Sequence, residues 1–193
     1  MKVIFLDHDG VICLATEWGG RHKKQREYGR KLSQSIESLP VHARFDNFNK
    51  KAVAILNEIL ERTNAEIVVS SDWKRWASVD EMGEYYEQQG IIKKPIAFTK
   101  SINDCEVPTD FQFSPKFDLE QERHFEILQF LKDNPQITHW VAIDDLNMGK
   151  VQKHETWGDM DLDWGLDNFV HTPKSREGIK QNGIKEKIIE FLK

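Results

Sequence analysis

Three short apolar segments of this sequence each end in side chains that could bind a metal ion or act on a phosphate group. The segments and the polar residues after them are 2–6 with Asp7 and Asp9, 65–69 with Ser70 and Ser71, and 139–143 with Asp144 and Asp145. Carboxylates bind hard divalent cations and serve as nucleophiles or proton carriers, and hydroxyls hydrogen-bond phosphate oxygens. The pair Asp7 and Asp9 alone also fits a polar turn after a strand, where Asp and Gly are common.

The elements around these residues predict an α/β fold. Branched and apolar runs predict strands at 2–6, 65–69, 95–98, 139–143 and 168–171, and helical spacing predicts helices at 49–62, 72–89, 119–132 and 184–192. Alternating strands and helices form a mostly parallel sheet, here of about five strands, with helices on both faces. Because ligands bind beyond the carboxyl ends of such strands, the three polar segments are expected to meet at one site.

The chain is expected to form a single domain, residues 1–193, with a small cap or flap insertion at residues 13–46. Within the insertion, residues 21–31 contain six Lys or Arg side chains. A charge run of this kind is either a solvated helical face or an electropositive flap that attracts an anionic substrate.

The composition is that of a globular protein, with 39% hydrophobic and 31% charged residues. The net charge of −5 argues against a generic nucleic-acid binder. No apolar run approaches the ~20 residues that span a bilayer, and the first residues lack the features of a signal peptide. We therefore expect a cytoplasmic protein, while delivery into a host cell by a specialised route stays open.

Three motifs resemble those of the haloacid dehalogenase-like (HAD) superfamily of phosphotransferases. They are FLDHDGVI at 5–12, IVVS at 67–70 and VAIDD at 141–145. The resemblance runs from residue 1 to about residue 172 and implies a Rossmann-like HAD fold. The segments around 69–74 and 123–127 are also similar to small phosphatase domains linked to RNA repair in bacteria and phages.

The resemblance implies a role for each acid of the motifs. Asp7 is the expected nucleophile, which forms an aspartyl-phosphate, and Asp9 is the expected general acid and base. Mg²⁺ is the expected cofactor, with the Asp7 side chain, the Asp9 main-chain carbonyl and the Asp144 side chain as ligands. Asp145 is expected to be an additional ligand or to support the others.

The phosphate-binding residues are less sharply defined by sequence. Ser70 is expected to hydrogen-bond a phosphate oxygen, with Ser71 and Gly10 as further phosphate contacts. The basic residue of the third family motif is assigned to Arg123, which precedes the last acidic motif by one predicted helix. Two alternatives for this position stay open, Lys116 and Lys100.

The motifs favour a phosphatase over the other activities of the superfamily and over other classes of phosphatase. A dehalogenase of this superfamily needs neither a metal nor an acid at the position of Asp9, and its ATPases carry membrane spans, which the sequence lacks. Neither cysteine is followed by Arg in a phosphate-cradling loop, which excludes a cysteine-based phosphatase. His8 lies between the two acids but is expected to point to the opposite side of the strand. A catalytically inactive binding module with the same fold is the remaining alternative.

The substrate is the least defined property. An insertion of 13–46 is too short for a large cap, so we expect an open site, a monomeric protein and a phosphate carried on a macromolecule. A phosphoprotein, with phosphotyrosine favoured, is the first expectation, because some bacterial effector phosphatases of the superfamily are similar in build. A 5′ or 3′ phosphate at a nucleic-acid end is the second, and a small metabolite is the third.

Overall fold

The computed structural model describes residues 1–29, 34–106, 119–149 and 165–193. Its centre is a five-stranded sheet in the order β3-β2-β1-β4-β5, in which every neighbouring pair is parallel. The strands are β1 (Lys2–Leu6), β2 (Glu66–Val69), β3 (Pro95–Phe98), β4 (His139–Asp144) and β5 (Phe169–His171). The predicted α/β class and all five predicted strands are therefore confirmed.

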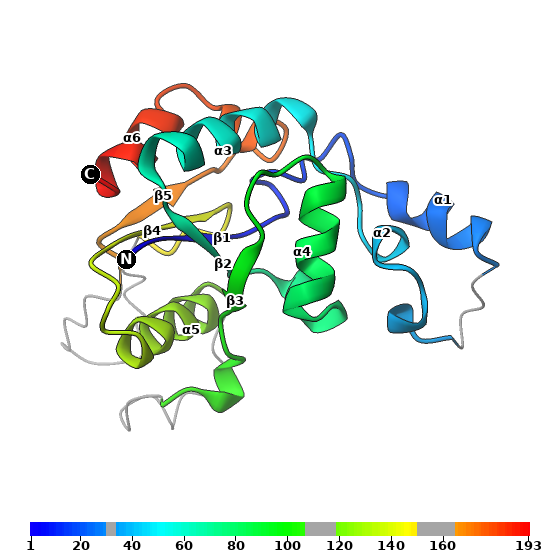
Figure 1. Ribbon diagram of the computed structural model, residues 1–193, viewed down its shortest axis with the longest axis horizontal. Helices are drawn as coiled ribbons and strands as arrows, with labels where there is room; N and C mark the ends of the chain where they lie inside the picture. The colour runs from blue at the N-terminus through cyan, green and yellow to red at the C-terminus, as the bar shows by residue number, and fades with distance from the viewer. Residues whose placement is uncertain (30–33, 107–118, 150–164) are drawn as a thin grey trace, which may run out of the picture.

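Helices cover both faces of the sheet (Figure 1). They are α1 (Gly20–Glu27), α2 (Val41–Arg44), α3 (Lys50–Thr63), α4 (Val79–Gln88), α5 (Leu119–Asp133) and α6 (Ile184–Phe191). The larger apolar core joins α3, α4 and α6 to one face, and a smaller core joins α5 to the other. Successive side chains of β1 enter the two cores in turn, Ile4 the first and Phe5 the second, as a strand buried on both faces requires.

The helix predicted at 72–89 is divided in two, which corrects the sequence reading. A 3₁₀ turn, η2, spans Asp72–Trp76, and α4 begins only at Val79. Ser78 caps α4 by accepting from the Glu81 N–H, while the Glu81 side chain accepts from the Ser78 N–H. Because this reciprocal cap starts a new helix at Val79, the residues between β2 and α4 do not have to continue a helix.

Helix α5 agrees with its apolar pattern only in part. The spacing predicts Phe125, Leu128 and Leu131 on one buried side; Phe125 is buried and Leu131 packs against the core, but 40% of the Leu128 surface is exposed. The buried positions instead include the polar residues Arg123, His124 and Glu126. Burying charged groups costs free energy unless they are paired. The charged side chains of α5 are therefore expected to have partners inside the protein.

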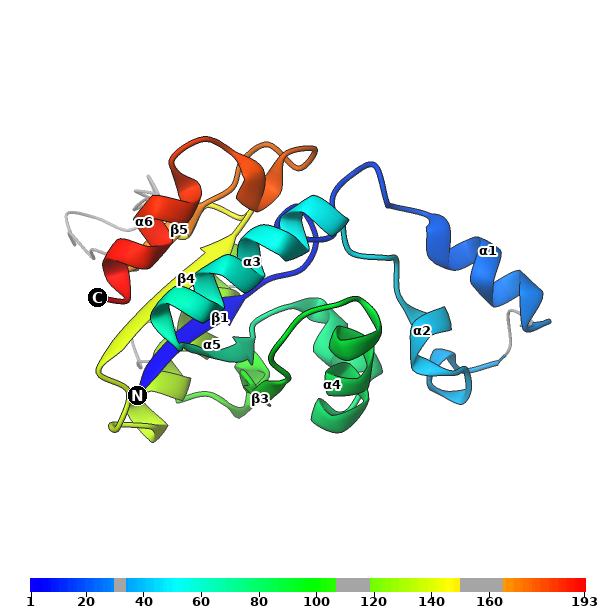
Figure 2. The same cartoon turned by 45° about the horizontal axis from the view of Figure 1, so that its top comes forward.

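The segment 13–46 contains α1, the short turn η1 (Ile36–Ser38) and α2. These elements lie at one end of the molecule, with α2 beside α4 and α1 beyond α2 (Figure 2). Its anchor is Asp46, which is 3% exposed and accepts from the main-chain N–H groups of Gly19 at 3.2 Å and Arg21 at 2.6 Å. Lys24 adds bonds from its ammonium to the carbonyls of His42 and Phe45. Helix α1, in which only Gln25 is buried, is thus fixed mainly by polar bonds.

No helix in the described part of the chain has the length and apolar character needed to cross a membrane.

Candidate active site

The carboxyl ends of the three central strands bring the predicted residues together. Strand β1 pairs in parallel with β2 on one side and β4 on the other, and Leu6 lies opposite Val69 and Ile143. The residues that follow these positions in the chain are Asp7, Ser70 and Asp144. The parallel register therefore places one residue of each motif at the same edge of the sheet, as the sequence predicts.

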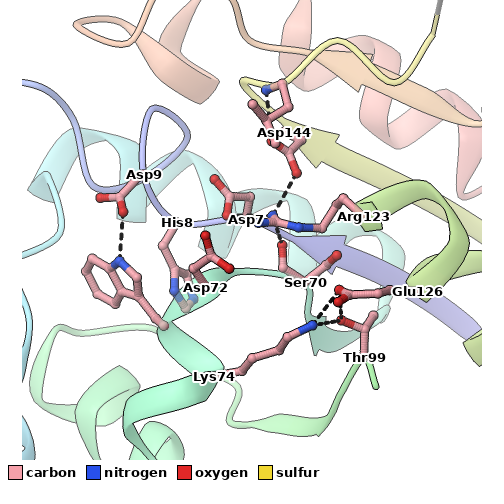
Figure 3. Close-up of polar contacts among 12 residues, drawn as sticks. Asp7, His8, Asp9, Ser70, Asp72, Lys74, Thr99, Arg123, Glu126 and Asp144 are labelled. Carbon is pink, nitrogen blue, oxygen red and sulfur yellow. Dashed lines mark hydrogen bonds and ion pairs between the residues drawn. The ribbon is translucent and has the colours of Figure 1, made fainter. Parts of the chain in front are cut away.

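Arg123 of α5 connects these three residues (Figure 3). Its Nη1 donates to Asp7 Oδ1 and to Asp144 Oδ2, both at 2.9 Å, and to the Ser70 carbonyl oxygen. The side chain is only 9% exposed. Burial lowers the pKa of Arg123, but the charges of Asp7 and Asp144 outweigh it and raise that pKa above its usual range. The guanidinium is thus a fixed positive charge inside the site.

The alternatives to Arg123 do not share this position. Lys100 pairs with Asp133 at 2.6 Å, and its side chain is 52% exposed. Lys116 lies outside the described residues.

Asp7, Asp144 and Asp145 form an acidic cluster that could hold a metal ion, with one oxygen from each within 4.8 Å of the others. Burial raises the pKa of Asp7 to about 6, against the opposing charge of Arg123. Burial also raises the pKa of Asp144 well above its ordinary value, and the charge of Asp7 adds to this shift. Three carboxylates face one guanidinium, an excess of two negative charges that a divalent cation would balance, so the cluster fits Mg²⁺.

Two serines, Ser70 and Ser71, follow β2 at the same edge of the sheet. Ser70 is 1% exposed, and its Oγ has no hydrogen-bond partner among the described residues. The Ser71 side chain hydrogen-bonds Asp7 and thereby favours the ionised carboxylate. A buried hydroxyl without a partner is costly, and the Ser70 Oγ is therefore available to accept or donate a further hydrogen bond.

Gly10 shapes the turn after Asp9. Its φ is +70°, and a Cβ built there would lie 2.2 Å from Asp145 Oδ2. Its N–H donates to the Cys13 carbonyl at 2.9 Å, so this amide is engaged in the turn instead of pointing to a phosphate. The structure therefore explains Gly10 by close packing against Asp145, and the predicted phosphate contact would require the turn to open.

Asp9 lies in different surroundings from Asp7. Its carboxylate is turned away from Arg123 (Figure 3), and its Oδ2 accepts from the Trp73 indole N–H at 2.8 Å. Burial raises the pKa of Asp9, while the bond from Trp73 opposes this shift. The ring of Trp73 stacks on Phe45 with the planes 5° apart and on Phe48 with the planes 14° apart. The hydrogen bond therefore comes from a rigid donor.

His8 points away from the acids, as the alternation of a strand predicts. It is fully buried, and its Nε2 is hydrogen-bonded to the Tyr86 hydroxyl at 2.7 Å. Burial lowers the pKa of His8 to about 3, so the ring is neutral. The ring packs among the buried side chains of Phe48, Trp73 and Tyr86.

Sequence reasoning missed a buried ion pair beside Ser70. The Lys74 ammonium contacts a Glu126 carboxylate oxygen and donates to Thr99 Oγ1 at 2.9 Å (Figure 3). The Lys74 and Glu126 side chains are 10% and 8% exposed. This pair ties the chain after β2 to the helix that carries Arg123. The signal was the Lys74 that follows the second motif closely, together with the Glu126 one helical turn after Arg123.

Of three comparisons with known proteins, one gives a match, to a family model. Neither the curated proteins nor the solved structures contain a match to the chain. A family model described as the HAD domain in Swiss Army Knife RNA repair proteins matches residues 3–181 and so includes every candidate residue above. The match and the parallel sheet with acids at its carboxyl edge agree, and the chain belongs to this family of HAD domains.

Proposed function

We propose that the protein is a magnesium-dependent phosphomonoesterase that acts through an aspartyl-phosphate on Asp7. The observation that supports this most directly is the Arg123 guanidinium between Asp7 and Asp144, in contact with Ser70, whose hydroxyl has no partner within the described ranges. A tetrahedral phosphate dianion needs such donors in a dry, charged site, because phosphoryl transfer depends mainly on positioning and charge neutralisation.

The two acids divide the reaction between them. A carboxylate oxygen of Asp7 forms a bond to phosphorus while the bond between phosphorus and the leaving oxygen breaks. Protonated Asp9 gives its proton to the leaving oxygen, and it then removes a proton from the water that attacks the aspartyl-phosphate. The second step releases inorganic phosphate and restores both acids.

The remaining residues hold the transferring group. Ser70 Oγ would donate to one phosphate oxygen, and Arg123 would keep Asp7 ionised and oriented. Asp7, Asp144, Asp145 and the Asp9 carbonyl would hold Mg²⁺, which supplies the positive charge that lets a phosphate dianion approach a carboxylate. Asp9 is placed for proton transfer by Trp73, which keeps its carboxylate directed away from the acidic cluster.

For the substrate, we propose a terminal phosphate of RNA. The family description names RNA repair proteins, and this favours the nucleic-acid end over the phosphotyrosine protein that the open site first suggested. Repair of a broken strand requires removal of a phosphate at an end, which is a phosphomonoester reaction of the class that this site fits.

The activity is tested by hydrolysis of p-nitrophenyl phosphate with Mg²⁺ and with excess EDTA. We expect activity only with Mg²⁺, and Asp7→Asn should lower kcat at least about ten-thousandfold, as loss of a nucleophile does. Asp80→Asn, an exposed acid on α4, is the matched control and should keep the wild-type rate. Equal inactivity of the wild type and Asp7→Asn would refute the enzyme and favour an inactive binding module.

The substrate is tested by comparing kcat/KM for oligoribonucleotides with a 5′ or 3′ phosphate against phosphotyrosine and phosphoserine peptides. We expect the best oligonucleotide to exceed both peptides, with an advantage that weakens as salt rises. A peptide that is preferred at every salt concentration would contradict RNA and restore the phosphoprotein.

A further inference from the structure

The direction of the leaving group is set by Asp9. Because Asp9 protonates the leaving oxygen in the proposed reaction, the rest of the substrate must lie on the Asp9 side of the phosphate and not on the Arg123 side. Asp9 and Cys13 form a β-bridge, so the segment from Cys13 to Arg21 starts next to Asp9. The side chains of this segment are therefore the nearest candidates for contact with the leaving group.

We propose that Trp18 and Arg21 form a subsite for the terminal nucleotides of an RNA strand. In this subsite the base next to the scissile phosphate stacks on the Trp18 ring, and Arg21 pairs with the following phosphate. The proposal rests on the proposed function and adds to it the residues that select a nucleic acid.

Trp18 is held at this position while much of its surface stays open. Its Nε1 donates to the Cys13 carbonyl at 3.2 Å, the same oxygen that accepts from the Gly10 N–H. The residue is nevertheless 48% exposed, which is costly for so large an apolar ring. An indole with one edge fixed and a large part of its surface exposed offers a stacking surface, which is how proteins commonly bind the bases of single strands.

Arg21 follows Trp18 by three residues, at the start of α1. Its main-chain N–H is fixed by Asp46 Oδ1 at 2.6 Å, and its Nε lies 3.8 Å from Asp46 Oδ2. The side chain is 42% exposed. A guanidinium has five N–H donors in a planar fork, so an Arg with one loose ion pair keeps the capacity to bind a phosphate.

The charge of the surroundings favours an anionic polymer. The chain as a whole carries a net charge of −5, but α1 has four basic residues and a single acid. Lys24 is engaged with main-chain carbonyls, whereas Lys23 and Arg26 are exposed. Basic side chains that continue away from Arg21 along α1 would meet successive phosphates of a strand, which a small metabolite or a neutral peptide does not offer.

The experiment uses a series of substrates that adds one group at a time. Ribose phosphate carries no base, adenosine monophosphate adds the base, and a phosphorylated diadenylate adds an internal phosphate, each as the 5′ and the 3′ isomer. For the wild type we expect kcat/KM to rise about tenfold with the base, as base–aromatic stacking provides, and to rise again with the internal phosphate.

The variants should each remove one of these steps. Trp18→Leu should abolish the gain from the base, and Trp18→Phe should restore most of it. Arg21→Gln should abolish the gain from the internal phosphate and lower the slope of log(kcat/KM) against log[salt] by roughly 0.7, the value for one phosphate contact on a single strand. The controls are Tyr28→Leu, an aromatic 50% exposed beyond the end of α1, and Arg62→Gln, a basic side chain 54% exposed on α3.

A second measurement does not depend on turnover. Binding of a fluorescent, phosphorylated oligoribonucleotide to the Asp7→Asn protein should weaken about tenfold when Trp18→Leu is added. If both variants keep the gains of the wild type, or if the wild type shows no gain from the base, the subsite is refuted while the phosphatase stands. If Trp18→Leu instead lowers kcat/KM for a preferred phosphotyrosine peptide, the subsite binds protein and the RNA assignment is wrong. Without any turnover, unchanged oligonucleotide binding in Trp18→Leu still refutes the subsite.

Discussion

The site has two sides that differ in chemistry although they begin two residues apart in the chain. On the sheet side, Asp7 and Asp144 are 5% and 1% exposed and share the buried charge of Arg123. On the side towards α1, Asp9 is partly exposed and accepts from an indole, and the exposed ring of Trp18 lies nearby. The closed, charged side suits a group that every substrate shares, the phosphate. The open, aromatic side suits the part that differs between substrates.

The comparison predicts that a substitution on the sheet side lowers both the stability of the protein and its activity on every substrate. Arg123→Met leaves Asp7 and Asp144 buried without their cation, so we expect a loss of about 3 kcal/mol in the free energy of unfolding at neutral pH, together with loss of activity on all substrates. Urea unfolding measures the stability, and Mg²⁺ should restore part of it because the ion binds only the folded state.

The control for this prediction is Arg62→Met, which removes an exposed ion pair with Glu58 and should cost about 0–1 kcal/mol. A similar small cost for Arg123→Met would mean that the sheet side is not held by its charges.

A substitution on the side towards α1 should change activity by an amount that depends on the substrate. Trp73→Phe keeps the ring that stacks on Phe45 but removes the N–H that orients Asp9. We expect kcat/KM to fall about tenfold for an alkyl phosphate, whose leaving oxygen needs a proton, and by less than about threefold for p-nitrophenyl phosphate, whose leaving group departs as an anion.

Trp76→Phe is the matched control, because Trp76 lies in the same 3₁₀ turn and is 41% exposed. An equal loss on both substrates would show that Trp73 supports the fold in general instead of the acid. A difference between the substrates would sharpen the division between the two sides.

The smallest expected effect is on the pH dependence of the unfolding free energy, and it comes from His124, the residue after Arg123 on α5. His124 is 7% exposed, and burial lowers its pKa to about 4 from 6.5. Because the unfolded chain takes up the proton first, the stability that neutral His124 maintains is present above pH 6.5 and is lost as the pH falls towards 4. His124→Gln should make the decline in unfolding free energy between pH 7 and pH 5.5 shallower by roughly 1 kcal/mol.

Thermal or urea unfolding at several pH values measures this difference. His139→Gln, an exposed histidine at the start of β4, is the control and should follow the wild-type curve. Parallel curves for His124→Gln and the wild type would show that His124 becomes protonated in the folded protein without cost.

Much of the site could be predicted because the motifs are local in sequence. Each of Asp7, Ser70 and Asp144 follows an apolar run, and the parallel register alone brings them to one edge of the sheet. The positions in helices were harder to predict. The apolar pattern of α5 placed Leu128 on the buried side with Phe125, whereas Leu128 is exposed and the polar side chains of Arg123 and Glu126 are buried instead.

The sequence by itself determined the five strands, the family and the acids that meet at one edge of the sheet, because hydrophobic periodicity and short motifs act over neighbouring residues. Only the tertiary structure decided which acid faces a cation and which faces an indole, because Arg123 and Trp73 reach Asp7 and Asp9 from segments 116 and 64 residues away. Such contacts depend on side-chain direction and packing in three dimensions, and no local pattern encodes them.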